Sequence, residues 1–178
     1  MNMGSADSTD LEAKPHRGDT PPPPGPHSVE PFRSVGFTVS TIGYAVAARF
    51  RKVLAPLGIE PREFALLRAV TATEGQSQQA IGERLRIPSS RMVAFVDALE
   101  GRGLIERRHD PTDRRTRALY LTDEGHALLA RAFAEALAHE QNLCGELNEQ
   151  EREQLLELLS RVGARLGLAP GVHAAMGE

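Results

Sequence analysis

Hydrophobic residues recur at steps of three and four along the chain from residue 35 onward, the spacing that places them on one face of an α-helix. This pattern predicts helices over residues 35–57, 61–74, 78–86, 89–100, 123–144 and 149–166. Ser77, Thr122 and Asn148 stand where side-chain N-caps are favoured, and Pro61 stands at a favoured first helical position. We expect the apolar residues of the last helix to be buried, namely Leu155, Leu159, Val162 and Leu166.

The periodicity changes after the fourth predicted helix. Residues 104–108 and 118–121 are typical of two short strands, and the loop between them is rich in charged residues. Between the third and fourth helices, Ile87-Pro88-Ser89 leaves room only for a tight turn. The predicted fold class is therefore mainly α with a small β-hairpin wing, a winged helix-turn-helix with further helices at both ends.

Charge is distributed unevenly along the chain, although the formal net charge is only −3. Residues 84–117 carry nine arginines against five acidic residues, whereas residues 123–160 carry two arginines against nine acidic residues. A local basic segment in an otherwise acidic protein is typical of a nucleic-acid-binding face. This distribution predicts that the helix-turn-helix and its wing contact double-stranded DNA.

The fourth helix and the hairpin loop supply the candidate DNA contacts. The N-terminal end of a recognition helix meets phosphates and base edges in the major groove, and arginine can read guanine through its bidentate fork. We expect Arg91 to read bases and the loop arginines to contact phosphates or the minor groove. Serines at a helix start also cap it, and capping does not exclude phosphate contact. The candidate DNA-binding residues are Ser89, Ser90, Arg91, Ala94, Arg114, Arg115 and Arg117.

The remaining segments are assigned by composition. Residues 1–33 hold seven of the twelve prolines and almost no large apolar residues, which predicts a disordered tail, either inert or a polyproline II ligand for a partner domain. One domain is predicted over residues 34–170, followed by a C-terminal tail over 171–178. Within it, 58–121 form the DNA-binding unit. Residues 34–57 and 122–168 are predicted dimerisation helices, because their apolar faces exceed what so small a winged unit can cover.

Three stretches of this sequence resemble the MarR family of bacterial regulators: residues 97–107 (DALEGRGLIER), 110–115 (DPTDRR) and 119–125 (LYLTDEG). The resemblance covers about residues 35–168. It implies a homodimer held by the first and last two helices, often acting as a repressor relieved by a small aromatic ligand, although the sequence leaves repression or activation open. It also implies that Arg115 lies at the wing tip, with Asp113 orienting the loop. Many members carry Thr or Ser followed by Arg or His where this chain has Val93 and Ala94.

An effector site is expected between the dimerisation helices and the DNA-binding unit if the resemblance holds. Tyr44, Arg51, Phe64 and Arg68 could offer rings and cations to an aromatic or phenolic acid. The alternative is that these four residues serve only packing and surface charge. Members that sense peroxides resemble one another in a reactive cysteine near the first helix, whereas Cys144 falls at the end of the fifth, where we expect a partly buried thiol.

Other function classes lack sequence support. The six histidines show no metal-ligand spacing, and no phosphate-binding loop or nucleophile elbow is present, so we expect no catalytic site, metal or cofactor. A scaffold that has lost DNA binding would be expected to carry a neutral wing, whereas this wing is cationic. The single cysteine suits a reducing compartment, and no apolar run or leader predicts a membrane partner or export, so the expected location is the cytoplasm.

Overall fold

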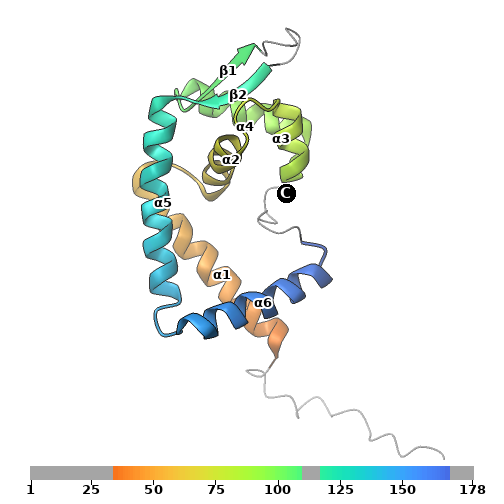
Figure 1. Cartoon of the computed structure of the whole chain (residues 1–178), viewed down its shortest axis with the longest axis vertical. Helices are drawn as coiled ribbons and strands as arrows, with labels where there is room; N and C mark the ends of the chain where they lie inside the picture. Colours follow the sequence, from red (N-terminus) through yellow and green to blue (C-terminus); the bar gives the residue numbers. More distant parts are fainter. Residues whose placement is uncertain (1–33, 110–116, 169–178) are drawn as a thin grey trace, which may run out of the picture. The chain divides into compact units, whose positions relative to one another are not determined.

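The computed structural model describes residues 34–109 and 117–168, and its backbone divides into two units, residues 1–41 and 42–178. The described elements follow the predicted order (Figure 1). They are α1 (Val35–Leu54), η2 (Ala55–Leu57), α2 (Pro61–Ala72), α3 (Gln78–Leu85), α4 (Ser89–Gly101), β1 (Ile105–His109), β2 (Arg117–Leu121), α5 (Asp123–Leu143) and α6 (Glu149–Arg165). None of these helices is long and apolar enough to cross a lipid bilayer.

The predicted N-caps of α3, α5 and α6 are confirmed, whereas α4 has Pro88 at its N-cap and no side-chain cap hydrogen bond, so the expected capping by Ser89 or Ser90 is not found. Ser77 begins α3 by accepting a hydrogen bond from a backbone N–H three residues later, and Thr122 begins α5 in the same way. Asn148 and Glu151 begin α6 with a reciprocal pair of hydrogen bonds of 3.0 and 2.9 Å. Each cap satisfies backbone donors that have no partner inside the helix. The helix starts are therefore encoded by local side chains.

The first helix ends earlier than its apolar pattern predicts. The α-helix stops at Leu54, and a short 3-10 helix continues to Leu57 before Gly58 turns the chain with a φ of 68°. Pro56 explains the change, because proline has no N–H to donate and its ring crowds the preceding turn of an α-helix. The helical spacing of hydrophobic residues therefore continues to Leu57, whereas the α-helix ends at Leu54.

The wing is an antiparallel pair in which Ile105 lies opposite Leu121 and His109 lies opposite Arg117. The loop between α2 and α3 adds a second, short pairing, with β2, that the sequence pattern did not predict. The N–H of Leu119 donates to the carbonyl of Gln76 at 3.0 Å, and the N–H of Gly75 donates to the carbonyl of Leu119 at 3.2 Å. The wing is thereby hydrogen-bonded to the segment that leads into the helix-turn-helix.

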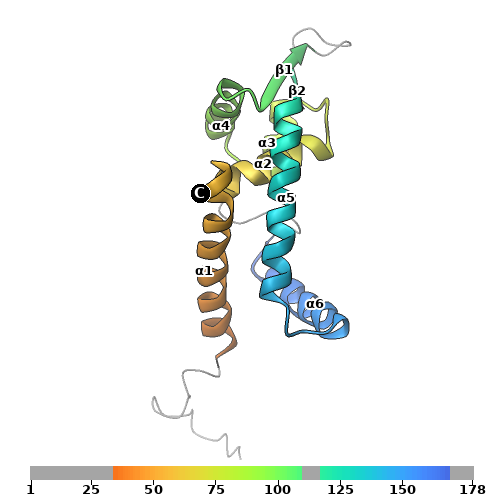
Figure 2. The same ribbon diagram turned by 90° about the vertical axis from the view of Figure 1, so that its left-hand side faces the viewer.

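The hydrophobic core joins α2, α3 and α4 to the wing and to the first half of α5. The strands lie beside the N-terminal end of α5, as Figures 1 and 2 show from two sides. Among the described residues no polar or charged side chain is buried. The largest fully buried side chains are Leu54, Leu66, Leu67, Ile81, Met92, Leu99, Ile105 and Leu119. This core fixes α4 and the hairpin as one body.

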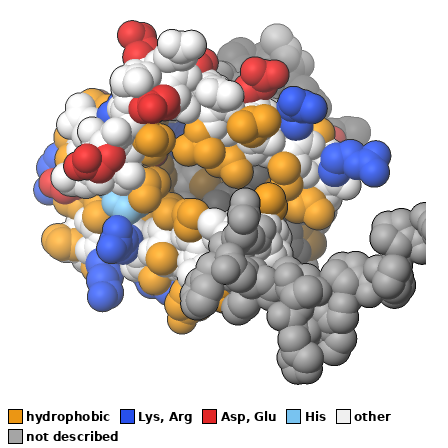
Figure 3. Space-filling view, turned by 90° about the horizontal axis from the view of Figure 1, so that it is seen from below, with side chains coloured by type: hydrophobic (Ala, Val, Ile, Leu, Met, Phe, Trp, Pro, Cys, Tyr) orange, Lys and Arg blue, Asp and Glu red, His pale blue; other side chains and the backbone are white. Residues whose placement is uncertain are grey.

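The last helix corrects one expectation. No residue of α6 is buried, and the four apolar residues predicted to be inside are 38–68% exposed. Hydrophobic side chains also gather on the face of the molecule seen in Figure 3. The prediction of burial was wrong for a single chain, because periodicity identifies an apolar face but not the surface that covers it.

Candidate DNA interface

The turn between α3 and α4 is a tight C-terminal cap. Arg86 adopts a left-handed conformation with a φ of 56°, and its N–H donates to the carbonyl of Glu83 at 3.1 Å. The next N–H, of Ile87, donates to the carbonyl of Gly82 at 2.9 Å. These two bonds form the Schellman pattern that closes a helix, and Pro88 then starts α4. The turn therefore fixes α4 relative to α3 through backbone hydrogen bonds.

The close approach of these helices depends on Gly82. A Cβ atom at this position would lie 3.3 Å from Cγ of Met92, which is fully buried in α4. Such contact is tighter than ordinary van der Waals packing. The helix-turn-helix is thus held by both its turn and a small residue at the crossing.

The outward face of α4 contains the predicted base-reading residues. Ser89, Ser90 and Ala94 are exposed, and Arg91 is half-buried. The opposite face of the helix is buried through Met92, Val96 and Leu99. The structure therefore brings the four candidates of this helix to its solvent-facing surface, at and near its N-terminal end.

Two of the candidate arginines have side chains that are not engaged elsewhere in the described part of the chain. No hydrogen bond or ion pair holds Arg91 there, and the same is true of the exposed Arg117 at the start of β2. The other predicted wing residues, Arg114, Arg115 and Asp113, lie outside the described residues.

Arg107 has a different role from the one its place in the basic segment suggests. Its side chain is only 14% exposed and forms ion pairs with Asp97 and Glu100 of α4. It also donates to Oε1 of Gln78 in α3 at 3.1 Å, and its backbone N–H donates to Glu100 at 3.3 Å. Arg107 therefore joins the wing to both helices of the helix-turn-helix.

Four more arginines of the basic segment form hydrogen bonds within the chain, among them Arg86, which donates to the carbonyl of Gly167 at 3.3 Å. Arg84 donates to the carbonyl of Ala69 at 2.9 Å, at the end of α2. Arg102 donates to Glu63 and to the carbonyl of Gly58. Arg108 pairs with Glu106, and this hydrogen bond raises the pKa of the guanidinium above its ordinary value. The sequence count of nine arginines therefore overstates the number that a DNA backbone could contact.

The expected effector residues are only partly brought together. Arg68 places its guanidinium 5.9 Å from the centre of the buried Phe64 ring. Arg51 instead pairs with Glu60 at 3.6 Å, and Tyr44 is 82% exposed. A ring and a cation thus meet at Phe64 and Arg68, whereas the other two side chains lie elsewhere.

Sequence reasoning missed the aromatic residues that surround Phe64. Its ring meets Phe50 of α1 at 5.7 Å and Phe133 of α5 at 5.4 Å, both in edge-on geometry. Phe50 also contacts the ring of His139 at 5.7 Å, and the buried Nε2 of His139 has no hydrogen-bond partner among the described residues. The aromatic spacing in α1 and α5 was visible in the sequence, but pairing across three helices was not.

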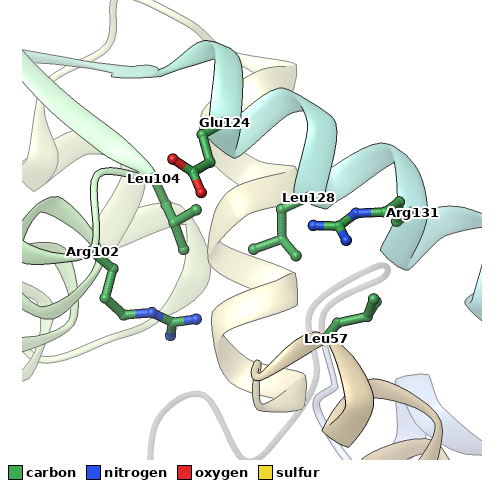
Figure 4. A pocket seen from close by; sticks show the side chains of 6 residues that line it. All are labelled: Leu57, Arg102, Leu104, Glu124, Leu128 and Arg131. Atoms are coloured by element: carbon green, nitrogen blue, oxygen red, sulfur yellow. The ribbon is translucent and has the colours of Figure 1, made fainter.

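A separate cavity of about 320 Å³ lies beside α5 (Figure 4). Its lining residues are Leu57, Arg102, Leu104, Glu124, Leu128 and Arg131. The four expected effector residues are absent from this lining. One of its two guanidinium groups, that of Arg102, is already engaged by Glu63 and Gly58.

Cys144 follows α5 and is partly buried, as predicted. Partial burial raises the pKa of its thiol, and the nearby carboxylate of Glu140, 3.5 Å from Sγ, raises it further. A raised pKa keeps sulfur in its less reactive protonated form. The surroundings of Cys144 therefore do not favour a reactive, redox-sensing thiolate.

Comparison with known proteins identifies the family. The MarR family model matches residues 57–116. The transcriptional regulator MhqR of Bacillus subtilis is 35% identical over 106 residues, which cover 60% of this chain and 73% of MhqR. The repressor CouR bound to a 23-mer DNA duplex superposes with a TM-score of 0.66 and 37% identity, covering 73% of this chain and 92% of that one.

The CouR protein of Rhodococcus jostii RHA1, bound to p-coumaroyl-CoA, has a TM-score of 0.64 and 29% identity, over 74% of this chain and 92% of that one. The residues matched by the family model include α4 and β1. The shared fold is mainly helical with a two-stranded wing, and the family consists of transcription regulators rather than enzymes. This chain belongs to the MarR family of DNA-binding, winged helix-turn-helix transcriptional regulators.

Proposed function

We propose that this protein is a homodimeric repressor that binds a near-palindromic operator through α4 and the wing of each protomer. One observation carries the proposal: α4 exposes its N-terminal residues on the outer face of a helix-turn-helix, in a chain 37% identical to a repressor bound to duplex DNA. A helix presented in this way enters the major groove with that end foremost.

The proposal gives each candidate residue a role. The hydroxyl groups of Ser89 and Ser90 donate hydrogen bonds to phosphates or base edges. Arg91 recognises guanine through two parallel hydrogen bonds. Ala94 allows close approach of the helix to the bases. In the wing, we assign phosphate or minor-groove contact to Arg114, Arg115 and Arg117, with Asp113 orienting the loop.

Dimerisation is supported by the apolar surface that a single chain leaves exposed. Every large apolar residue of α6 is at least 38% exposed, and α5 exposes Phe133 and Leu137 at 47% and 60%. A second copy of the same helices would cover this surface, since closed two-fold symmetry is the commonest arrangement of soluble oligomers. Such a dimer would present two α4 helices about 34 to 36 Å apart, one turn of DNA.

An effector would act by favouring a dimer geometry that no longer matches this spacing. The CouR protein of Rhodococcus jostii RHA1 was solved with p-coumaroyl-CoA, an aromatic thioester, which supports an aromatic ligand here as well. Of the four candidate residues, Phe64 and Arg68 offer a ring and a cation together, and Tyr44 and Arg51 would have to approach as the dimer forms or the ligand binds. Isothermal titration with p-coumaroyl-CoA and with salicylate tests this part. Heat of binding that Arg68→Ala removes is expected, and no heat with either compound would contradict it.

The experiment for the main proposal is selection of duplexes from a random library by the full-length protein. We expect an enriched near-palindrome whose half-sites are spaced about one helical turn apart. Enrichment of a single unrepeated site would contradict the dimeric mode of reading, and no enrichment would contradict operator binding itself.

A further inference from the structure

One exposed hydrophobic residue lies where neither the core nor a dimer interface accounts for it. Val93 is in the first half of α4 and is 44% exposed. In the described part of the chain, every other exposed large hydrophobic residue lies on α1, α5, α6 or just after α6. Val93 is therefore the one such residue carried by the helix-turn-helix.

The neighbours of Val93 place it on the DNA-facing side of the helix. Ser89 and Ser90 lie one turn before it, Ala94 lies beside it, and all three are exposed. Residues three and four apart share one face of a helix. Because these neighbours are short, the branched side chain of Val93 projects beyond them and would reach a groove floor that they leave open.

Asp97, one turn after Val93, does not prevent Val93 from approaching the DNA groove. Asp97 is exposed and would repel DNA as a lone carboxylate, but it pairs with Arg107 of β1. The ion pair offsets part of this negative charge, since Arg107 is shared with Glu100, and it directs the Asp97 carboxylate toward the wing. Val93 therefore lies between two serines and an acid whose carboxylate is held by an arginine of the wing.

A valine side chain can neither donate nor accept a hydrogen bond. In the major groove, the feature that such a side chain can recognise is the C5-methyl group of thymine, because the other distinguishing groups are hydrogen-bond donors and acceptors. Contact between the two would remove apolar surface from water on both partners. An apolar side chain at Val93 is therefore suited to contact thymine rather than the other three bases.

We propose that Val93 reads thymine methyl groups in each operator half-site, so that specificity arises from an apolar contact beside the hydrogen bonds of Ser90 and Arg91. This inference rests on the proposed function, since it requires α4 to lie in the major groove. It assigns to Val93 a specificity-determining role and predicts at least one thymine at a fixed place in each half-site.

The test replaces thymidine by deoxyuridine, which lacks the C5-methyl group and keeps the same base-pairing edge. The probe is the duplex enriched from the random library, with each half-site thymine replaced in turn and affinity followed by fluorescence anisotropy. We expect one replacement to weaken binding of the wild-type protein about three- to fivefold, the scale of one lost methyl contact.

Variants at the same position assign the effect to Val93. Val93→Ala should bind the thymidine and deoxyuridine duplexes equally, whereas Val93→Ile, which keeps a branched apolar side chain, should retain the preference for thymidine. This double substitution of residue and base isolates the pairwise contact. The exposure of Val93 makes both variants compatible with the fold, which circular dichroism would verify.

The outcomes separate this inference from the proposal on which it rests. Tight binding that is insensitive to deoxyuridine at every half-site, or a sensitivity unchanged in Val93→Ala, would overturn the methyl contact and leave the operator-binding proposal standing. Failure to bind any duplex would overturn both.

Discussion

Gly125 is a residue at which α5 closely approaches the start of the wing. A Cβ atom there would lie 2.1 Å from the carbonyl oxygen of Leu104, at the start of the hairpin. Thr122 adds to this junction, since its hydroxyl donates to the carbonyl of Gly103 at 2.6 Å and its N–H donates to that of Leu104 at 3.2 Å. The first turn of the long helix is therefore fitted directly onto the wing.

Gly125→Ala is expected to destabilise the protein by about 3 kcal/mol, because the backbone oxygen it meets cannot move away as a flexible side chain could. Thermal unfolding should show a fall in Tm of roughly 6 to 12 °C. Gly101→Ala is the matched control, since nothing lies within 4 Å of its Cβ position. Equal Tm values for the two variants would contradict this packing.

Cys144 offers a prediction about pH. Burial and the nearby Glu140 carboxylate raise the pKa of its thiol, so the reactive thiolate forms only at more alkaline pH than for an ordinary cysteine. We expect slow alkylation by iodoacetamide near neutral pH and a steep rise in rate above the usual thiol pKa. Glu140→Gln removes a negative charge and should shift the rate profile toward lower pH. A profile that is unchanged in this variant would show that the carboxylate has no such effect.

At the scale of elements, the orientation of the wing depends on one arginine. The guanidinium of Arg107 joins β1 to Asp97 and Glu100 of α4 and to Gln78 of α3. Hydrogen bonds to charged groups at a mostly buried side chain are stronger than those at the surface. The relative placement of recognition helix and wing therefore rests on this side chain as well as on the core.

Arg107→Leu should lower the free energy of unfolding by about 1 to 3 kcal/mol and weaken DNA binding without changing base preference, since Arg107 acts through the wing. The control is Arg108→Leu, on the same strand, whose ion pair with Glu106 is exposed to solvent and should contribute little to stability. Chemical denaturation and anisotropy would measure both effects. Equal losses of stability in the two variants would argue against a special role for Arg107.

Particular elements show how far the sequence predicts the fold. Caps such as Ser77 and Thr122 are local signals, and the helix starts that they mark were predicted correctly. The early end of α1 was also signalled locally, by Pro56, but the hydrophobic period outweighed it. The pairing of Gln76 with Leu119 was not predictable in this way, because it joins segments about forty residues apart with no turn chemistry between them.

The candidate site was predictable to a similar degree. The exposed position of Ser89, Ser90 and Ala94 follows from helical periodicity, because the buried residues define the opposite face. The engagement of Arg107 is harder to foresee, since a row of arginines looks uniform in sequence. The one signal in the sequence was the alternation of the short strand, which turns Arg107 inward. Its role in joining the wing to α4 becomes clear only from its ion pairs with Asp97 and Glu100.

At the scale of the whole molecule, the proposed second protomer would cover the apolar face of α6. The terminal α6 buries none of its residues in a single chain, yet Leu155, Leu156, Leu158 and Leu159 form an apolar run along it. Helices of this length are only marginally stable without tertiary packing. Partner helices would supply that packing and would also set the distance between the two DNA-reading helices.

Leu156→Glu combined with Leu159→Glu should convert the proposed dimer to a monomer, because carboxylates buried in an apolar interface would have no partner. Light scattering coupled to size exclusion would show the mass of one chain in place of two, and affinity for a palindromic duplex should fall. Glu153→Gln, on the same exposed helix, should leave the dimer intact. A double variant that keeps the mass of two chains would show that α6 does not hold the dimer.

The most direct measurement of the central claim is an anisotropy titration of the selected duplex at several salt concentrations, with wild-type protein and an Arg91→Ala, Arg115→Ala double variant. The logarithm of affinity should fall linearly with the logarithm of salt concentration, by about 0.9 for each phosphate contact. The variant should bind at least about tenfold more weakly, since loss of a base-reading arginine alone is expected to cost about 1 to 3 kcal/mol. Equal affinity and equal salt dependence for the two proteins would contradict DNA reading by α4 and the wing.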